Sequence, residues 1–218
     1  MNYRLAIVTT DRPERYLHLT LVSLLATGWT DPVDIYADAR IPDSAWPLDH
    51  HDQFRFHRTS RRPQSPRANF AAALSAGPTD QDLLILEDDV VFANGWQRVV
   101  DRIRQGLGGT EYLLSLYWCC ERIPELTDLP IVSCPHDLFT CSQALLLQAS
   151  YLPAMRDHFN ASRRREGDLT VGDFVTAKGI PIYIAQPSLV QHWGKRSAAG
   201  SFYQQSPTFR GDAEEAHR

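Results

Sequence analysis

Short apolar segments alternate with helical patterns along this chain, and the alternation restricts the folds that it can adopt. Apolar runs of about four to eight residues are typical of buried strands, whereas apolar residues spaced three and four apart form one face of a helix. Strands are predicted at 4–10, 33–38, 54–57, 83–86, 112–117, 144–147 and 182–185. Helices are predicted from a Thr10–Glu14 start to Gly28, and at 69–76, 96–103, 151–159 and 168–177. This order predicts an α/β protein with a mostly parallel central sheet flanked by helices, and a small antiparallel element in the more mixed second half.

Length and composition place the chain among globular enzymes and binding proteins. The 218 residues predict one domain, residues 1–209, with a polar C-terminal tail at 210–218. The segment from Gly200 onward is expected to be mobile or lid-like. Lys and Arg total 22 against 26 Asp and Glu, a net charge of −4, which argues against bulk coating of nucleic acid. The chain has no membrane-spanning apolar run and no signal-peptide pattern, which predicts a cytoplasmic protein.

Three acidic residues follow directly after the most apolar strand. Leu83–Leu86 leads into Glu87, Asp88 and Asp89. Ligands of open α/β sheets bind at the carboxyl ends of the strands. Adjacent carboxylates repel one another unless a cation lies among them, and Mn²⁺ or Mg²⁺ binds such oxygens while bridging phosphates. The motif predicts a metal–diphosphate site; the alternative is a solvated acidic turn that caps the next helix.

Polar residues after the first strand and around His192 are further candidates for ligand binding. Thr9, Thr10 and Arg12 follow the first strand and could bind an anion or a nucleotide, although the chain has neither GxGxxG nor a Walker loop. His192 follows an apolar segment and could complete a metal shell or bind phosphate; the alternative is a structural histidine. Lys195 and Ser197 could contact phosphate, or lie in an ordinary exposed loop.

Two acids on the late helix are candidates for proton transfer. Asp173 stands among apolar neighbours, where desolvation would raise its pKa, and Asp168 could cap the same helix. The alternative is that both only complement the helix dipole. Two basic clusters, Arg61, Arg62 and Arg67 with Arg163–Arg165, could bind an acidic acceptor or could be solvated faces. The four cysteines, Cys119, Cys120, Cys134 and Cys141, lack zinc-ligand spacing and are interpreted as small apolar residues; the alternative is a metal site that includes His136.

Taken together, these motifs resemble a GT-A (Rossmann-like) glycosyltransferase over about residues 5–209. The resemblance is closest to N-glycan branching N-acetylglucosaminyltransferases and their small bacterial and phage relatives. The motifs that carry it are Thr9-Thr10-x-Arg12-Pro13, Arg67-x-Asn69, Leu86-Glu87-Asp88-Asp89, Thr140-x-Ser142-Gln143-Ala144, the acidic segment to Asp173, and Pro187-Ser188-Leu189-Val190-Gln191-His192-x-Gly194-x-x-Ser197.

The resemblance implies a role for each matching position. A nucleotide-sugar donor, UDP-linked in these relatives, is held through Mn²⁺ or Mg²⁺. The implied metal ligands are Asp89, with Asp88 between the metal and the ribose, and His192. The implied nucleotide contacts are Thr9, Arg12, Asp38, Arg67, Asn69 and Glu87. Asp173 matches the base of inverting relatives, with Asp168 as the fallback because Phe174 replaces the family's tryptophan.

The expected activity is metal-dependent, inverting transfer of a sugar to an acceptor hydroxyl. The acceptor is left open among a glycan, a small molecule, a protein and a hydroxymethylated base of phage DNA. Two other classes compete with this interpretation. A nucleotidyltransferase would also use acids and a metal, but normally has a Gly-rich loop near its N-terminus; a non-catalytic module would bind sugar nucleotides without turnover.

Overall fold

Strands and helices alternate in the computed structural model as the sequence pattern predicts. It describes residues 3–11, 16–38, 41, 52–58, 66–118, 129–140, 142–164, 166–194 and 205–213. The strands are β1 (Tyr3–Thr9), β2 (Val33–Ala37), β3 (Phe54–Arg58), β4 (Asp82–Glu87), β5 (Val90–Phe92), β6 (Leu113–Ser115), β7 (Ile131–Cys134), β8 (Ala144–Leu147), β9 (Ile182–Ala185) and β10 (Val190–His192). The α-helices are α1 (Leu17–Ala26), α2 (Pro66–Ser75), α3 (Trp96–Leu107), α4 (Leu152–Ala161) and α5 (Gly167–Lys178), and short 3₁₀ turns precede α4 and follow β7.

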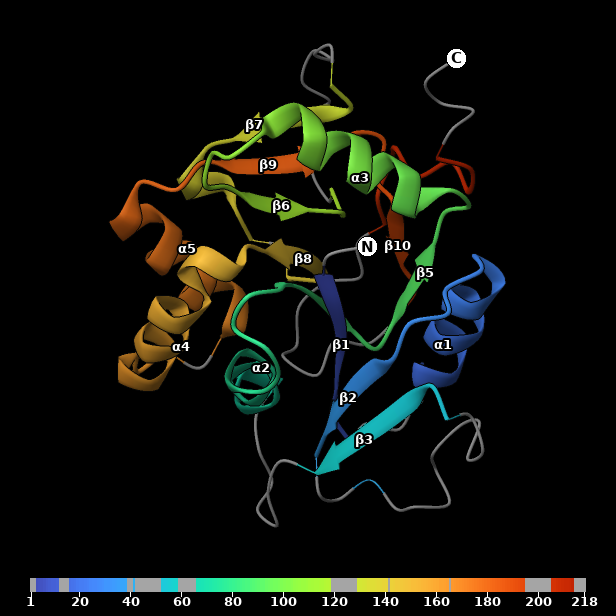
Figure 1. Ribbon diagram of the computed structural model, residues 1–218, viewed down its shortest axis with the longest axis horizontal. Helices are drawn as coiled ribbons and strands as arrows, with labels where there is room; N and C mark the ends of the chain where they lie inside the picture. Colours follow the sequence, from blue (N-terminus) through green and yellow to red (C-terminus); the bar gives the residue numbers. More distant parts are fainter. Residues whose placement is uncertain are drawn as a thin grey trace.

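An eight-stranded sheet runs through the centre of the molecule in the order β3-β2-β1-β4-β8-β6-β9-β7 (Figure 1). β3, β2, β1 and β4 are parallel; β8 is antiparallel to both neighbours, β6 and β9 are parallel to each other, and β7 is antiparallel to β9. A second, two-stranded antiparallel sheet pairs β5 with β10. The predicted α/β class, with a small antiparallel element, is confirmed.

Helices cover both faces of the large sheet because apolar residues alternate along its strands. On β1, Leu5 and Ile7 pack in a core with α1 and α3, whereas Ala6 and Val8 pack in a core with α2, α4 and α5. Figure 1 shows α1 on one side of β1 and α2, α4 and α5 on the other.

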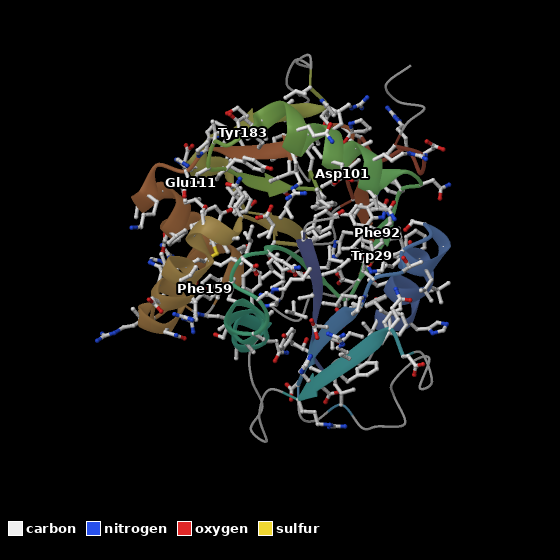
Figure 2. The ribbon with its side chains drawn as sticks, in the orientation of Figure 1. Trp29, Phe92, Asp101, Glu111, Phe159 and Tyr183 are labelled. Atoms are coloured by element: carbon white, nitrogen blue, oxygen red, sulfur yellow. The ribbon has the colours of Figure 1, made fainter. Side chains whose placement is uncertain are left out.

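Aromatic rings reinforce each of the two cores. Figure 2 labels Trp29 and Phe92 on the α1 side, where both rings pack against that of Trp96 with centroids 5.7 and 5.0 Å apart. Phe159, labelled on the other side, stacks on Phe70 of α2 at 5.1 Å. Both faces of the sheet are therefore buried, which fixes the edge where the strands end as the place for a site.

Three local details differ from the sequence prediction. α1 begins at Leu17 rather than in the Thr10–Glu14 turn, and the short strands β5 and β7 are additional to the predicted set. The expected mobile tail is instead packed over 205–213: Ser206 and Thr208 are buried, and the Ala213 N–H donates to the Asn94 carbonyl at 2.9 Å. Within the described ranges, none of the helices is both long enough and apolar enough to cross a bilayer.

Candidate active site

The carboxyl ends of β1, β2 and β4 bring four of the predicted site residues together. Thr9 ends β1, and its hydroxyl donates to a carboxylate oxygen of Asp88, which follows β4. The Thr9 carbonyl accepts from the Asn69 side-chain amide at 2.7 Å and from the Asp38 N–H at 3.3 Å. All four residues are buried. Their contacts follow from the parallel register, in which Val8 lies opposite Glu87 and Thr9 opposite Ala37.

Asp89 and His192 meet although 103 positions separate them. The antiparallel pairing of β5 with β10 places His192 opposite Val90, the residue after Asp89. The imidazole Nε2 lies 3.1 Å from Asp89 Oδ2, and both side chains are nearly fully buried. The Trp193 N–H also donates to the Asp89 carbonyl at 2.7 Å, and the Tyr117 ring stands edge-on to His192. Two predicted metal ligands therefore share one corner.

Gly194 lies against this pair, and the contact leaves no room for a side chain. A Cβ at this position would stand 2.2 Å from Asp89 Oδ2 and 3.0 Å from His192 Nε2. Real Cβ atoms essentially never stand within 3.0 Å of another atom, so the carboxylate would have to move. Only glycine at this position lets the backbone approach the carboxylate and the imidazole this closely.

Helix α1 holds the acidic turn in place through two hydroxyl side chains. Buried Thr20 accepts from the Val90 N–H at 3.1 Å and donates to the Asp88 carbonyl at 2.7 Å. Ser23 accepts from the Phe92 N–H at 2.8 Å. Sequence reasoning missed both residues because a helical pattern does not show which hydroxyl faces a distant strand.

Glu87 lies on the β8 side of the same edge. Its carboxylate accepts from the Ser142 hydroxyl at 2.6 Å, and its N–H donates to the Gln143 carbonyl at 2.9 Å. Glu87, Asp88 and Asp89 thus have three different surroundings. One carboxylate faces Ser142, one faces Thr9 and one faces His192, and this separation limits the repulsion between adjacent charges.

Two contacts fix the packing of α5. The His136 imidazole lies 2.8 Å from the Ile180 carbonyl just past the end of α5, and Phe139 packs on Gly172 in its middle. α5 leads into β9, whose first residue, Ile182, pairs with Leu113 at the edge of the sheet opposite the acidic turn. α5 therefore ends near that opposite edge, and Asp168 lies at the other end of the helix.

The two acids of α5 differ in their surroundings. Burial raises the pKa of Asp168 above its ordinary value, and the Leu169 N–H, which donates to its carboxylate, offsets part of that rise. Asp173 is not desolvated as the sequence argument expected: its side chain is 43% exposed and forms a two-pronged ion pair with Arg164. Asp168 is thus the acid whose burial favours proton uptake.

Comparisons with known proteins identify the fold. No protein-family model and no curated protein matches the sequence. Among solved structures, 4-diphosphocytidyl-2C-methyl-D-erythritol synthase from Anaerococcus prevotii is similar with a TM-score of 0.52 and 12% identity, over 87% of this chain and 92% of that one. A nucleotidyl transferase from Methanothermobacter thermautotrophicus is similar with a TM-score of 0.57 and 13% identity, over 84% and 87%. The chain has a fold that nucleotidyltransferases use.

Of the remaining predicted residues, Thr10 lies at this edge, Arg67 lies apart from it, and several others fall outside the described ranges. Arg67 turns away from Thr9, and its guanidinium donates to the Phe159 and Ser162 carbonyls at the end of α4. Thr10 directly follows β1. The residues outside the described ranges are Arg12, Lys195 and Ser197, three of the cysteines (Cys119, Cys120 and Cys141), and Arg61, Arg62 and Arg165 of the basic clusters. Cys134 is buried, and its thiol donates to the Pro135 carbonyl at 3.4 Å.

The described residues do not form a complete metal shell by themselves. Over these ranges, no group of three or more His, Cys, Asp or Glu side chains is placed to hold one ion. Asp89 and His192 supply two ligands, while Asp88 is engaged with Thr9. An ion at this corner would need further ligands from a bound substrate.

Proposed function

We propose that this protein transfers a sugar from a nucleotide-sugar donor, with UDP as the nucleotide, to an acceptor hydroxyl. One observation carries the proposal: the β5–β10 pairing joins the acidic turn after β4 to His192 at the carboxyl edge of the central sheet. This edge is where open α/β sheets bind nucleotides. The solved structures of similar fold include nucleotidyltransferases, which supports a nucleotide substrate.

The donor set at the corner fits a divalent ion that a diphosphate completes. Asp89 and His192 would hold Mn²⁺ or Mg²⁺, beside the bare backbone of Gly194. Ions of this class commonly take one or two protein carboxylates and fill their other positions with substrate phosphates and water. When bound, such an ion offsets the negative charge that develops on the departing diphosphate.

The carboxyl ends of β1, β2 and β4 supply the polar groups that a nucleoside requires. Asp38 and Asp88 offer carboxylate oxygens that can accept from ribose hydroxyls, with Asp38 fixed through the Thr9 carbonyl. Thr10 continues from β1 beside them. Arg12, Lys195 and Ser197 are proposed as phosphate contacts on the resemblance alone. The chain's own residues thus orient the donor at the point where it is cleaved.

Within this mechanism we assign the base to α5. An inverting transfer requires one carboxylate that takes the acceptor proton on the face opposite the leaving group. Asp168 suits this role better than Asp173, because burial raises its pKa and it lies in the first turn of α5, at the end of the helix away from the start of β9. Asp173, by contrast, is paired with Arg164. Asp168→Asn should abolish transfer while nucleotide binding is kept, and an equal loss only in Asp173→Asn would reverse the assignment.

Thermal-shift titrations with UDP and Mn²⁺ test the proposal. UDP and Mn²⁺ together should raise the melting temperature more than the sum of each alone, because each completes the other's site. Asp89→Asn should remove this excess shift, while Asp157→Asn, the same change at an exposed residue of α4, should keep it. An Asp89→Asn variant that retains the excess shift, or a wild-type protein that shows none, would refute the proposal.

A nucleotidyltransferase is the second candidate, because the similar solved structures belong to that class. It fits this sequence less well, since the first glycine is Gly28 and the loop after β1 has none to cradle a triphosphate. Release of pyrophosphate from a nucleoside triphosphate in the presence of sugar phosphates would favour this class. Release of UDP from a UDP-sugar would favour the proposed one.

A further inference from the structure

Three buried polar atoms near the candidate active site have no hydrogen-bond partner in the described structure. They are the indole Nε1 of Trp118 and the side-chain oxygens of Gln143 and Gln186. The Trp118 and Gln186 residues are 5% and 4% exposed. Buried polar groups in native proteins are nearly always paired, because burial without a partner costs free energy. Three such atoms in one region therefore require an explanation.

The strand order places these residues on one edge of the sheet. β8, β6 and β9 are neighbours (Figure 1). Gln143 precedes β8 and Gln186 follows β9, and hydrogen bonds between strands continue through both residues: the Glu87 N–H donates to the Gln143 carbonyl, and the Gln186 N–H donates to the Pro130 carbonyl. Trp118 follows β6 and donates its N–H to the Ser188 hydroxyl at 2.9 Å.

The same three side chains share one face. Leu145 and Ile184 belong to the core on the α5 side, and strand side chains repeat their direction every second residue. Gln143 and Gln186 lie two residues farther along, toward the edge, and Trp118 belongs to the same core. With strands about 4.8 Å apart, the two glutamines are separated by about 10 Å, with β6 and the residues that follow it in between. We call Trp118, Gln143 and Gln186 the polar row.

The polar row adjoins the acidic turn through Ser142, which contacts Glu87. Its unpaired atoms are one N–H donor and two oxygen acceptors, and it carries no charge. Sugar hydroxyls both donate and accept hydrogen bonds. An uncharged row would not offset the charge of a phosphate, and an ammonium would lose its water there without gaining a counter-charge.

From this arrangement we propose that the polar row binds the hydroxyl groups of a sugar ring. The inference deepens the proposed function, on which it rests for the presence of a sugar at this edge. The sugar can belong either to the acceptor or to the donor. Because the three atoms are closed to solvent, a ligand reaches them only as this edge opens.

Stability measurements separate a binding role from a structural one. Gln143→Leu and Gln186→Leu replace an unpaired oxygen by an apolar group of similar shape, so the melting temperature should stay the same or rise. Gln148, at the other end of β8, is the matched control: its oxygen accepts from the Tyr112 N–H at 2.7 Å and its amide donates to the Thr110 carbonyl. Gln148→Leu should lower the melting temperature by about 3 °C or more. A similar drop in Gln186→Leu would show a structural role and overturn the proposal.

Binding measurements identify the source of the sugar. The probes are methyl glycosides of glucose, mannose and N-acetylglucosamine for the acceptor, and UDP-glucose and UDP-N-acetylglucosamine compared with UDP for the donor. Gln143→Leu and Gln186→Leu should weaken either a glycoside or the sugar-dependent part of UDP-sugar affinity about tenfold, with UDP itself unaffected. Gln148→Leu should bind as wild type does.

Three binding results would also overturn the proposal: no binding of any probe to the wild type, equal binding to the variants, or binding of 5-hydroxymethylcytidine in place of the sugars. Asp89→Asn tests the proposed function separately, since it should remove Mn²⁺-dependent UDP binding and leave methyl glycoside binding intact. Loss of sugar binding in the glutamine variants, with UDP binding kept, would therefore be distinguishable from failure of the nucleotide site.

Discussion

Gly194 is the residue whose replacement tests the Asp89–His192 corner most directly. Gly194→Ala would place a methyl group 2.2 Å from Asp89 Oδ2, so the carboxylate must move. We expect Mn²⁺-dependent UDP affinity to fall about tenfold or more, with a stability loss of about 1–3 kcal/mol from overpacking. Isothermal titration with UDP and Mn²⁺ measures the first effect. Gly109→Ala is the control, because nothing lies within 4 Å of the added Cβ; equal affinities in both variants would contradict the prediction.

Asp168 makes the stability of the protein depend on pH in a defined direction. Its pKa is raised by burial above the ordinary value of 3.8, so the folded state holds this proton more tightly than the unfolded state does. Below pH 3.8 the group is protonated in both states and contributes nothing. As pH rises above that value, the ionised carboxylate costs folding free energy, and this cost is complete once pH exceeds the folded-state pKa.

The change Asp168→Asn should therefore raise the melting temperature at neutral pH and leave it unchanged in acid. The Asn oxygen can still accept from the Leu169 N–H, so the local hydrogen bond is kept. Melting curves of wild type and variant across the acid-to-neutral range measure the difference. Asp173→Asn is the matched comparison on the same helix and should not raise the melting temperature at neutral pH, because it removes the ion pair with Arg164 and no buried charge. A variant less stable than wild type at neutral pH would contradict the stated cause.

Helix α1 and strand β5 form a unit that sets the position of the acidic turn. Thr20→Val removes a buried hydroxyl that serves both the Val90 N–H and the Asp88 carbonyl. Because both backbone groups are then left unpaired, we expect a loss of about 2 kcal/mol in the free energy of unfolding, together with weaker Mn²⁺-dependent UDP binding. Urea denaturation measures the loss. Thr20→Ser keeps the hydroxyl and should restore most of both properties; if Thr20→Ser is as impaired as Thr20→Val, packing rather than hydrogen bonding is responsible.

The sequence predicts the long elements well and the contacts between distant ones poorly. The apolar pattern at 83–86 and 144–147 corresponds to β4 and β8, and 168–177 corresponds to α5 within one residue at each end. β5 could not be predicted, since three residues carry no period and its partner β10 lies about a hundred positions away. For the same reason the sequence indicated Asp89 and His192 as separate features, and only the pairing of β5 with β10 shows that they touch.

Polar groups lie together at the carboxyl edge of the central sheet because helices cover both faces of the sheet. Polar residues excluded from the two cores then collect where the strands end, and this explains why Thr9, Asp38 and Asp88 stand at the ends of three different strands yet lie together. The alternating pattern of the sequence predicts such an edge. It does not predict that Arg67 points to α4 instead, since helix α2 can present this residue to either neighbour.

The segment 205–213 forms hydrogen bonds with residues beside β10 and β5, the two strands of the small sheet. Gln191, the neighbour of His192, accepts from the Ser206 N–H at 2.7 Å and donates to the Ser206 carbonyl at 3.2 Å. Ser206 and Thr208 also form a buried hydroxyl network with Ser188. Farther on, Asp212 pairs with Asn94, which lies between β5 and α3. The segment therefore braces both strands of the two-stranded sheet that carries His192.

Two truncated chains test whether the segment 205–213 stabilises the two-stranded sheet. A chain that ends after Ala213 keeps every described contact and should melt within about 1 °C of the full chain. A chain that ends after residue 204 leaves Ser188 and Gln191 without their partners, and should lose about 2 kcal/mol or more, equivalent to ~4–8 °C in melting temperature for a chain of this size. It should also lose Mn²⁺-dependent UDP binding, because His192 is held through the carbonyl oxygen of the Gln191 side chain, which accepts the His192 N–H at 3.1 Å. Equal melting of the two truncated chains would show that the segment packs without bracing the site.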